Sequence, residues 1–142
     1  MPPETRFRSN SPPVIQETID GETIMVNLDT GSYYWLDPLA SYLCGSMEDG
    51  ASLEEIVEEV GRRFPTEGPA VEREVRALAD RLVEEALLVT ANGAEPTDRA
   101  PRAFPALASF EPPIFKIYTD MQELLLLDPV HDVGVEGWPE PR

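Results

Sequence analysis

The chain has 142 residues, 42% of them hydrophobic and 27% charged, which is enough for one domain with a modest core and short extensions. Its 27 acidic and 11 basic residues give a net charge of −16, which argues against nucleic-acid binding and against an anionic membrane surface. A positively charged peptide or protein surface is the electrostatically favourable partner.

The residue types that most often carry catalysis or metal binding are scarce. Cys44 is the only cysteine, so the chain can form neither an internal disulfide nor a thiolate metal site. The apolar helical pattern around Cys44 indicates a small buried side chain. His131 is the only histidine, and it lies in a proline-punctuated stretch with nothing expected to orient it. We therefore expect no catalytic residue, no metal and no cofactor.

The first 13 residues, MPPETRFRSNSPP, are rich in proline and show no periodicity, which predicts a disordered, flexible arm over residues 1–13. They contain no apolar signal core, and no run in the chain approaches the ~18 apolar residues of a membrane span. The sequence therefore predicts a cytoplasmic protein.

Three β-strands are expected next. VIQETI (14–19) and ETIMVNL (22–28) are joined by Asp20-Gly21, a two-residue hairpin signal because both turn positions favour positive φ. A second turn, DTGS, leads into YYWLD (33–37), the third strand. These signals predict a three-stranded antiparallel meander.

Three helices should follow the strands, over residues 38–47, 52–64 and 71–89. Pro38 suits the first turn of a helix, with Asp37 before it as the N-cap. Ser52 followed by Glu55 is a capping box, and the apolar residues of the second and third helices recur at helical spacing. The order of elements predicts an α+β domain over residues 14–90, with the helices packed on one face of the sheet.

After the domain the composition changes. Residues 91–109 are rich in alanine and proline and read as a linker, and residues 110–142 form an extended tail. The tail is too short and too interrupted by proline to build its own core. Its four consecutive leucines, at 124–127, would be an aggregation liability if left bare, so they need a surface on which to dock.

The stretch VNLDTGSYYWLDPLASYL (26–43), with the helices that follow it, resembles the PqqD family of peptide-recognition domains, also called RiPP recognition elements, over about residues 14–89. The resemblance implies a winged-helix-like fold that binds the leader of a ribosomally synthesised precursor peptide. It implies no catalytic activity for this chain alone. A winged helix also suggests DNA binding, but the last helix carries more acids than bases, which would repel phosphate.

The resemblance further implies that the leader adds a strand beside the third strand and against the last helix. An exposed strand edge offers unpaired backbone groups to such a peptide. Neighbouring residues on a strand point to opposite sides, so Trp35 and Leu36 cannot both face the groove. The candidate peptide-binding residues are Tyr33, Tyr34, Trp35, Leu36, Glu74, Leu78, Arg81 and Leu82.

The tail begins with FEPPIF, which is similar to the aromatic-x-x-Pro-x-aliphatic pattern of lasso-peptide leaders. Phe115 stands where that pattern has an aliphatic residue, and the Thr-x-Gly junction that usually follows is absent. The hypothesis is a recognition domain that carries its own leader-like ligand, bound in cis or swapped into a neighbouring molecule. The residues assigned to this leader-like tail are Phe110, Pro113, Phe115, Tyr118, Leu124 and Leu125.

The main hypothesis is a non-catalytic adaptor that presents a precursor leader to RiPP-modifying enzymes. The alternative is a precursor protein whose own C-terminal tail is modified, with the folded domain as a recognition handle. A third possibility is a winged helix used only for protein contacts. For MQELLLLD (121–128), a packed helix, a docking motif and a modifiable segment all remain open, with docking ranked first.

Overall fold

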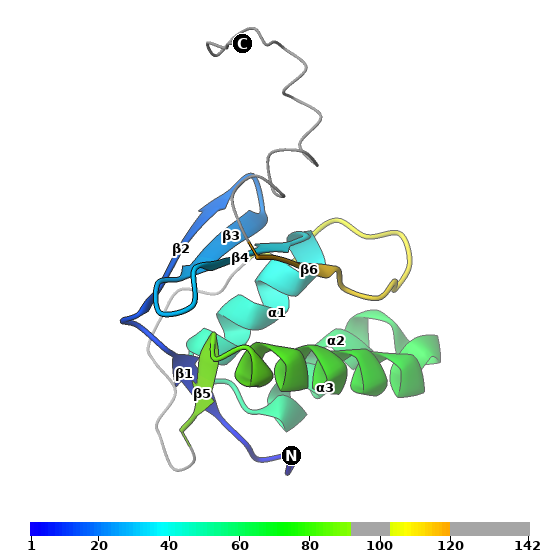
Figure 1. Cartoon of the computed structure of the whole chain (residues 1–142). Helices are drawn as coiled ribbons and strands as arrows, with labels where there is room; N and C mark the ends of the chain where they lie inside the picture. Colours follow the sequence, from blue (N-terminus) through cyan, green and yellow to red (C-terminus); the bar gives the residue numbers. More distant parts are fainter. Residues whose placement is uncertain (92–102, 120–142) are drawn as a thin grey trace, which may run out of the picture.

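A computed structural model of the chain describes residues 1–91 and 103–119 (Figure 1). Along the chain, the elements are β1 (Phe7–Ser9), β2 (Val14–Ile19), β3 (Glu22–Asn27), β4 (Ser32–Leu36), α1 (Pro38–Glu48), α2 (Leu53–Arg63), the 3-10 turn η1 (Pro65–Glu67), α3 (Gly68–Glu84), β5 (Leu88–Thr90) and β6 (Phe115–Tyr118). The predicted α+β class with three α-helices is confirmed for this part of the chain.

The main sheet is antiparallel, with the strand order β2-β3-β4-β6. Asp20 and Gly21 connect β2 to β3 with φ of 55° and 84°, as their hairpin signal predicted. The sequence predicted three strands, whereas the sheet has four. Residues 115–118, which were assigned to the tail, supply the fourth strand at the edge of β4 (Figure 1).

A second, two-stranded sheet joins the start of the chain to the end of the domain. β1 pairs antiparallel with β5, and Phe7 of β1 is only 1% exposed. The expected flexible arm over residues 1–13 therefore needs correction, because part of it forms a strand and contributes to the core. The last helix is also shorter than predicted: α3 ends at Glu84, Ala86 takes a positive φ of 60°, and β5 begins two residues later.

The helix caps are those expected from the sequence. The Asp37 side chain accepts a hydrogen bond from the backbone N–H of Ala40, 2.8 Å away, and Pro38 occupies the first helical position of α1. Ser52 and Glu55 form the predicted capping box at the start of α2. These caps fix where α1 leaves the sheet and where α2 begins.

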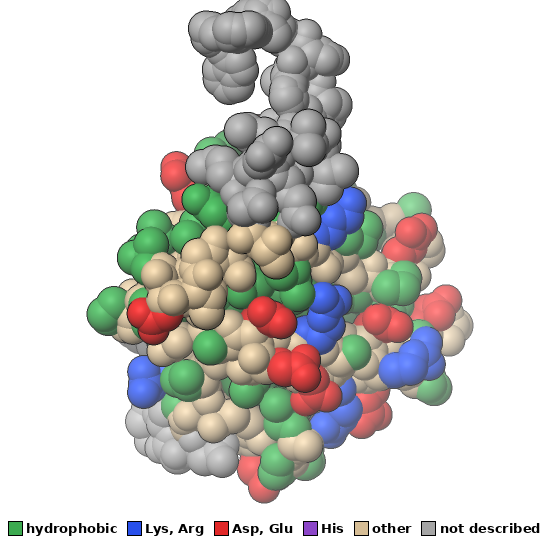
Figure 2. Space-filling model, viewed as in Figure 1, with side chains coloured by type: hydrophobic (Ala, Val, Ile, Leu, Met, Phe, Trp, Pro, Cys, Tyr) green, Lys and Arg blue, Asp and Glu red, His purple; other side chains and the backbone are tan. Residues whose placement is uncertain are grey.

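The core lies between one face of the main sheet and the helices. Met25 and Leu36 of the sheet are fully buried, as are Leu43 of α1, Ile56 of α2 and Leu82 of α3. α1 packs directly on β3 and β4, and α2 packs on α3 (Figure 1). Around α3, Figure 2 shows acidic and basic side chains interspersed on the surface.

Membrane-spanning helices and metal-binding clusters are both absent from the described residues. Within residues 1–91 and 103–119, no helix is long and apolar enough to cross a membrane. The same part of the chain contains no group of three or more His, Cys, Asp or Glu side chains arranged to hold a metal ion.

Candidate functional site: the edge of β4 and its groove

The candidate site is the edge of β4 that faces away from β3. A strand edge carries backbone N–H and C=O groups that need partners, and it is therefore a natural place for an extended segment to add. In this structure β6 occupies that edge, with Tyr34 opposite Ile117 and Leu36 opposite Phe115. The backbone N–H of Asp37 also donates to the carbonyl oxygen of Ile114, 3.1 Å away, so the pairing continues just beyond β4.

The side chains of β4 alternate between the two faces of the sheet. Tyr34 and Leu36 point into the domain and are 1% and 0% exposed. Tyr33 and Trp35 lie on the opposite, outer face and are half-buried. On that outer face the indole N–H of Trp35 donates to a carboxylate oxygen of Glu22 at 3.1 Å. The groove side of β4 is therefore formed by Tyr34 and Leu36.

β4 and α3 together hold one side chain of β6. The ring of Phe115 stacks on that of Tyr34, with the centroids 5.7 Å apart and the planes 9° apart. From α3, the guanidinium carbon of Arg81 lies 4.7 Å from the centroid of the same Phe115 ring. Phe115 is consequently buried between a strand and a helix that the sequence predicted to form the two walls of a groove.

The hydroxyl of Tyr34 is fixed by the end of α3. It donates a hydrogen bond to a carboxylate oxygen of Glu85, 3.1 Å away. Burial raises the pKa of the Tyr34 hydroxyl, and the hydrogen bond to the neighbouring Glu85 carboxylate raises it further, against an opposing hydrogen bond from Ser32. Tyr34 therefore stays protonated near neutral pH and keeps its ring oriented toward the groove.

A second contact area holds the segment that precedes β6. The ring of Phe104 meets Tyr42 of α1 edge-on at a centroid distance of 4.9 Å, and the guanidinium carbon of Arg63 lies 4.1 Å from the Phe104 centroid. Phe110 packs on Phe64 at 5.7 Å. These aromatic contacts lie on α1 and on the C-terminal end of α2, away from the β4 edge.

The sequence reasoning missed this second area because Phe104 falls in a stretch whose composition indicated a linker. A signal was nevertheless available: two phenylalanines interrupt an alanine- and proline-rich stretch in which apolar aromatic residues serve no purpose unless they pack. The phenol of Tyr42 donates to the Glu59 carboxylate, and burial together with this carboxylate raises the pKa of Tyr42 to about 12. Tyr42 is thus a neutral, oriented partner for Phe104.

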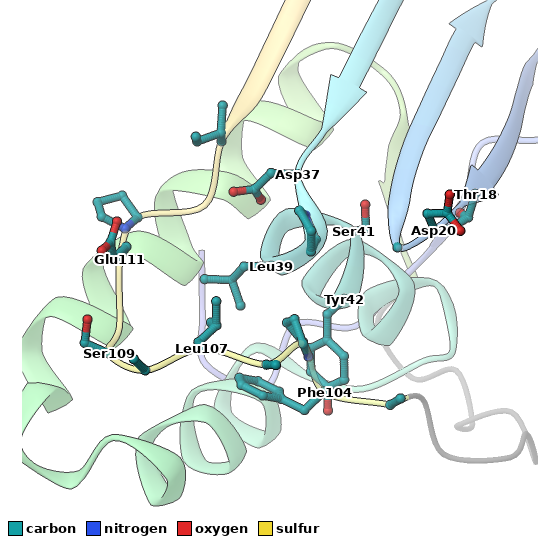
Figure 3. A pocket seen from close by; sticks show the side chains of 18 residues that line it. Thr18, Asp20, Asp37, Leu39, Ser41, Tyr42, Phe104, Leu107, Ser109 and Glu111 are labelled. Carbon is teal, nitrogen blue, oxygen red and sulfur yellow. The ribbon is translucent and has the colours of Figure 1, made fainter.

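Between the two contact areas, the segment arches over the start of α1 and leaves an open cavity of about 860 Å³. Figure 3 shows Phe104 beside Tyr42 at one end of this arch, with Leu39 and Leu107 facing one another. Asp20 of the β2–β3 turn and Asp37 also line the cavity. The segment is therefore held at both ends and partly buried at Leu107 and Phe110 between them, with the open cavity beneath it.

Of the sequence-predicted site residues, the structure brings Tyr34, Arg81 and Phe115 together. Leu78 and Leu82 are 4% and 0% exposed and belong to the hydrophobic core. Glu74 is half-buried, with a carboxylate oxygen 3.6 Å from Nε of Arg73. Pro113 is half-buried, and Tyr118 is buried opposite Tyr33. Leu124 and Leu125 lie outside the described residues.

The chain is similar to known proteins in sequence and in fold. The family model "Coenzyme PQQ synthesis protein D (PqqD)" matches residues 22–88, which run from β3 to β5. The solved structure of TbiB1 in complex with the TbiA(beta) leader peptide is 32% identical, with a TM-score of 0.51, covering 57% of this chain and 93% of that one. No curated protein matches the sequence. The chain belongs to the PqqD family, as the resemblance of its β4 region suggested.

Proposed function

We propose that this protein is a non-catalytic recognition protein that binds the leader of a ribosomally synthesised precursor peptide and presents it to modifying enzymes. The leader adds as a strand to the edge of β4, with its inward side chains covered by α3. The observation that carries the proposal is the pairing of an extended segment, β6, with this edge.

The chemistry of the groove suits an extended peptide. The backbone of β4 supplies hydrogen bonds that do not depend on the ligand's sequence, whereas alternate ligand side chains enter the space between β4 and α3. Tyr34 forms the floor of that space and Arg81 covers it, which favours an aromatic or apolar side chain in the ligand. Such binding requires no covalent step, so we expect no turnover by this chain.

The comparison with TbiB1 supports the same assignment, because that relative was solved with a leader peptide bound. The alternative, in which the tail is itself modified, depends on residues beyond 119 that lie outside the described part of the chain. Nothing in the described residues favours it over leader recognition.

The test uses the full chain carrying Phe115→Asp, which places a charge where the chain's own aromatic ring enters the groove. A fluorescein-labelled peptide with the sequence of residues 103–119 is titrated into it, and the TbiA(beta) leader peptide serves as a second probe. We expect saturable binding of at least the first probe. A further Arg81→Gln substitution should weaken it, and Arg73→Gln on the exposed face of α3 should leave it unchanged. If no peptide binds the folded Phe115→Asp chain, the proposed function is wrong.

A further inference from the structure

We propose that the chain's own segment, residues 103–118, is a tethered ligand that occupies the leader groove and excludes other peptides until β6 detaches from β4. This inference rests on the proposed function, because it assumes that the β4 edge is where a leader binds. It adds that the groove is closed from within the same molecule.

The first step of the argument is the backbone. A β-strand has two edges, and β3 already pairs with one edge of β4 over residues 32–36. β6 pairs with the other edge over residues 33–36, and the N–H of Asp37 is used by Ile114. A second extended peptide therefore finds no backbone partners on β4 while β6 is in place.

The second step is the side chains. Phe115 fills the space between Tyr34 and Arg81 so completely that it is 7% exposed. An incoming peptide that placed an aromatic or apolar side chain in that space would collide with Phe115. Phe115 therefore fills the side-chain space of the groove, while the backbone of β6 occupies the edge of β4. A second peptide is sterically excluded from both.

The third step is that β6 is able to leave without unfolding the domain. It is a four-residue strand at the sheet edge, and the segment before it lines an open cavity over α1 and is only partly buried where it packs on the domain. The fully buried core of the domain is built from residues 7–88, and Phe115 is the segment's one member of it; Phe104, Leu107, Phe110 and Ile117 pack against this core while partly exposed. The contacts of Phe104 and Phe110 with α1 and the end of α2 are separate from the β4 edge, so they keep the released strand near the groove.

Such tethering makes the segment a strong competitor. Effective concentrations for tethered ligands are on the order of 1 mM. Suppose that the segment, as a separate peptide, binds the open groove with a Kd on the order of 10 µM. The tethered segment then occupies the groove most of the time, and the apparent affinity for any outside peptide falls by about 100-fold. A leader must then bind the open groove tightly, or a partner enzyme must help to release β6.

The decisive experiment compares the wild-type chain with the Phe115→Asp chain, both at full length, in titrations with the labelled 103–119 peptide. We expect the Phe115→Asp chain to bind it about 10- to 100-fold more tightly than the wild type, since the substitution removes the internal competitor. Lys116→Pro, which removes an N–H that faces β4 opposite Trp35, should act in the same direction. Glu111→Gln, an exposed change in the arch, should bind like the wild type.

The outcomes separate the two proposals. Equal affinity of the wild-type, Phe115→Asp and Lys116→Pro chains would overturn the tethered-ligand inference and leave leader recognition intact. Failure of both opened chains to bind any peptide would overturn the proposed function, and with it the competition. Hydrogen exchange adds an independent readout: the backbone amides of Lys116 and Tyr118, which face β4, should be protected in the wild type, and that protection should be lost in Phe115→Asp. In Lys116→Pro the amide of Tyr118 reports the same loss. Fast exchange of these amides in the wild type would contradict the closed groove.

Discussion

The rings of Phe115 and Tyr34 stack with their planes 9° from parallel. All three helices lie between these two residues along the chain. This contact joins the strand that the PqqD resemblance marked as the peptide edge to the segment that the sequence marked as leader-like. The two segments therefore form one site, to which α3 also contributes, because Arg81 covers the same Phe115 ring. The contact also identifies the substitutions that should separate folding from peptide binding.

Phe115→Ala should release the end of the tail without unfolding the domain. The change removes the stacking on Tyr34 and the buried ring of Phe115, and truncation of a buried phenylalanine typically costs about 3–5 kcal/mol. That cost falls on the docking of β6, so the tail should become sensitive to limited proteolysis while the thermal unfolding midpoint changes little. Ile114→Ala, at a side chain that is 45% exposed, is the matched control and should leave the cleavage pattern unaltered. Identical cleavage of both variants would show that Phe115 does not hold the tail.

Arg81→Gln should loosen β6 by a smaller amount. A cation over an aromatic ring contributes about 0.5–1 kcal/mol at a partly exposed position, which corresponds to a two- to fivefold change in the docking equilibrium. Hydrogen exchange of the amides of Lys116 and Tyr118, which face β4, would report this change directly. Arg73→Gln is the control on the same helix, because its side chain is 67% exposed. Equal exchange in the two variants would mean that the Arg81 contact contributes no measurable energy.

Much of the fold could be predicted because its signals are local. The Asp20-Gly21 turn, the Pro38 start of α1 and the Ser52/Glu55 capping box each depend on a few adjacent residues, and each is present in the structure. β1 and β5 could not be predicted in the same way. Each is three residues long, and each becomes a strand only because the other end of the domain lies beside it. Because the pairing joins residues far apart in the chain, the sequence around each short strand shows no periodic pattern that would predict it.

The site was predictable in its location and less so in its residues. The family resemblance indicated the third strand and the last helix, and alternation along a strand showed that only half of β4 could face the groove. Sequence alone could not distinguish helix residues that face the groove from those that face the core. Arg81 and Leu82 are neighbours, yet Arg81 covers Phe115 and Leu82 is fully buried in the core. That distinction depends on how α3 is rotated against α1 and the sheet.

Leu82→Ala should therefore act as a stability variant rather than as a binding variant. Leu82 has no exposed surface, and truncating such a leucine typically costs about 2–5 kcal/mol because a cavity remains. Urea unfolding should show a lower midpoint than the wild type. Arg81→Gln is the comparison, since its midpoint should stay close to that of the wild type while its tail docking weakens. A Leu82→Ala chain with wild-type stability and impaired peptide binding would show that Leu82 contacts the peptide instead of supporting the core.

Phe7→Ala should destabilise the whole domain, contrary to what a flexible arm would imply. The Phe7 ring is 1% exposed and packs in the core, so its loss should cost about 3–5 kcal/mol, whereas a phenylalanine in a free arm would cost almost nothing. Arg8→Gln changes the next residue of β1, whose side chain is exposed, and serves as the control. Urea unfolding followed by circular dichroism distinguishes the two cases. An unchanged midpoint for Phe7→Ala would show that β1 contributes nothing to stability.

Glu55 should contribute to stability in a pH-dependent way, because its carboxylate completes the cap of α2. The backbone N–H of Ser52 donates to Oε1 of Glu55 at 2.9 Å, and Arg6 lies 3.2 Å from the same oxygen. The hydrogen bond from Ser52 is the main reason that the pKa of Glu55 is lowered, with Arg6 adding to the effect.

A carboxyl group whose folded-state pKa is lowered stabilises the fold fully above its ordinary pKa, and it loses that contribution as the pH falls through the lowered value. Glu55→Gln should therefore be less stable than the wild type at pH 7 by about 0.5 kcal/mol, a small amount because the half-exposed carboxylate is screened by water. In urea unfolding the difference should shrink as the pH falls below the ordinary glutamate pKa of about 4.3, because the Glu55 carboxylate then becomes protonated. Glu58→Gln, at an exposed position on the same helix, is the control for the loss of one negative charge. A gap between wild type and Glu55→Gln that stayed constant from pH 7 to pH 3 would mean that the cap acts through geometry alone and that the charge of Glu55 adds nothing.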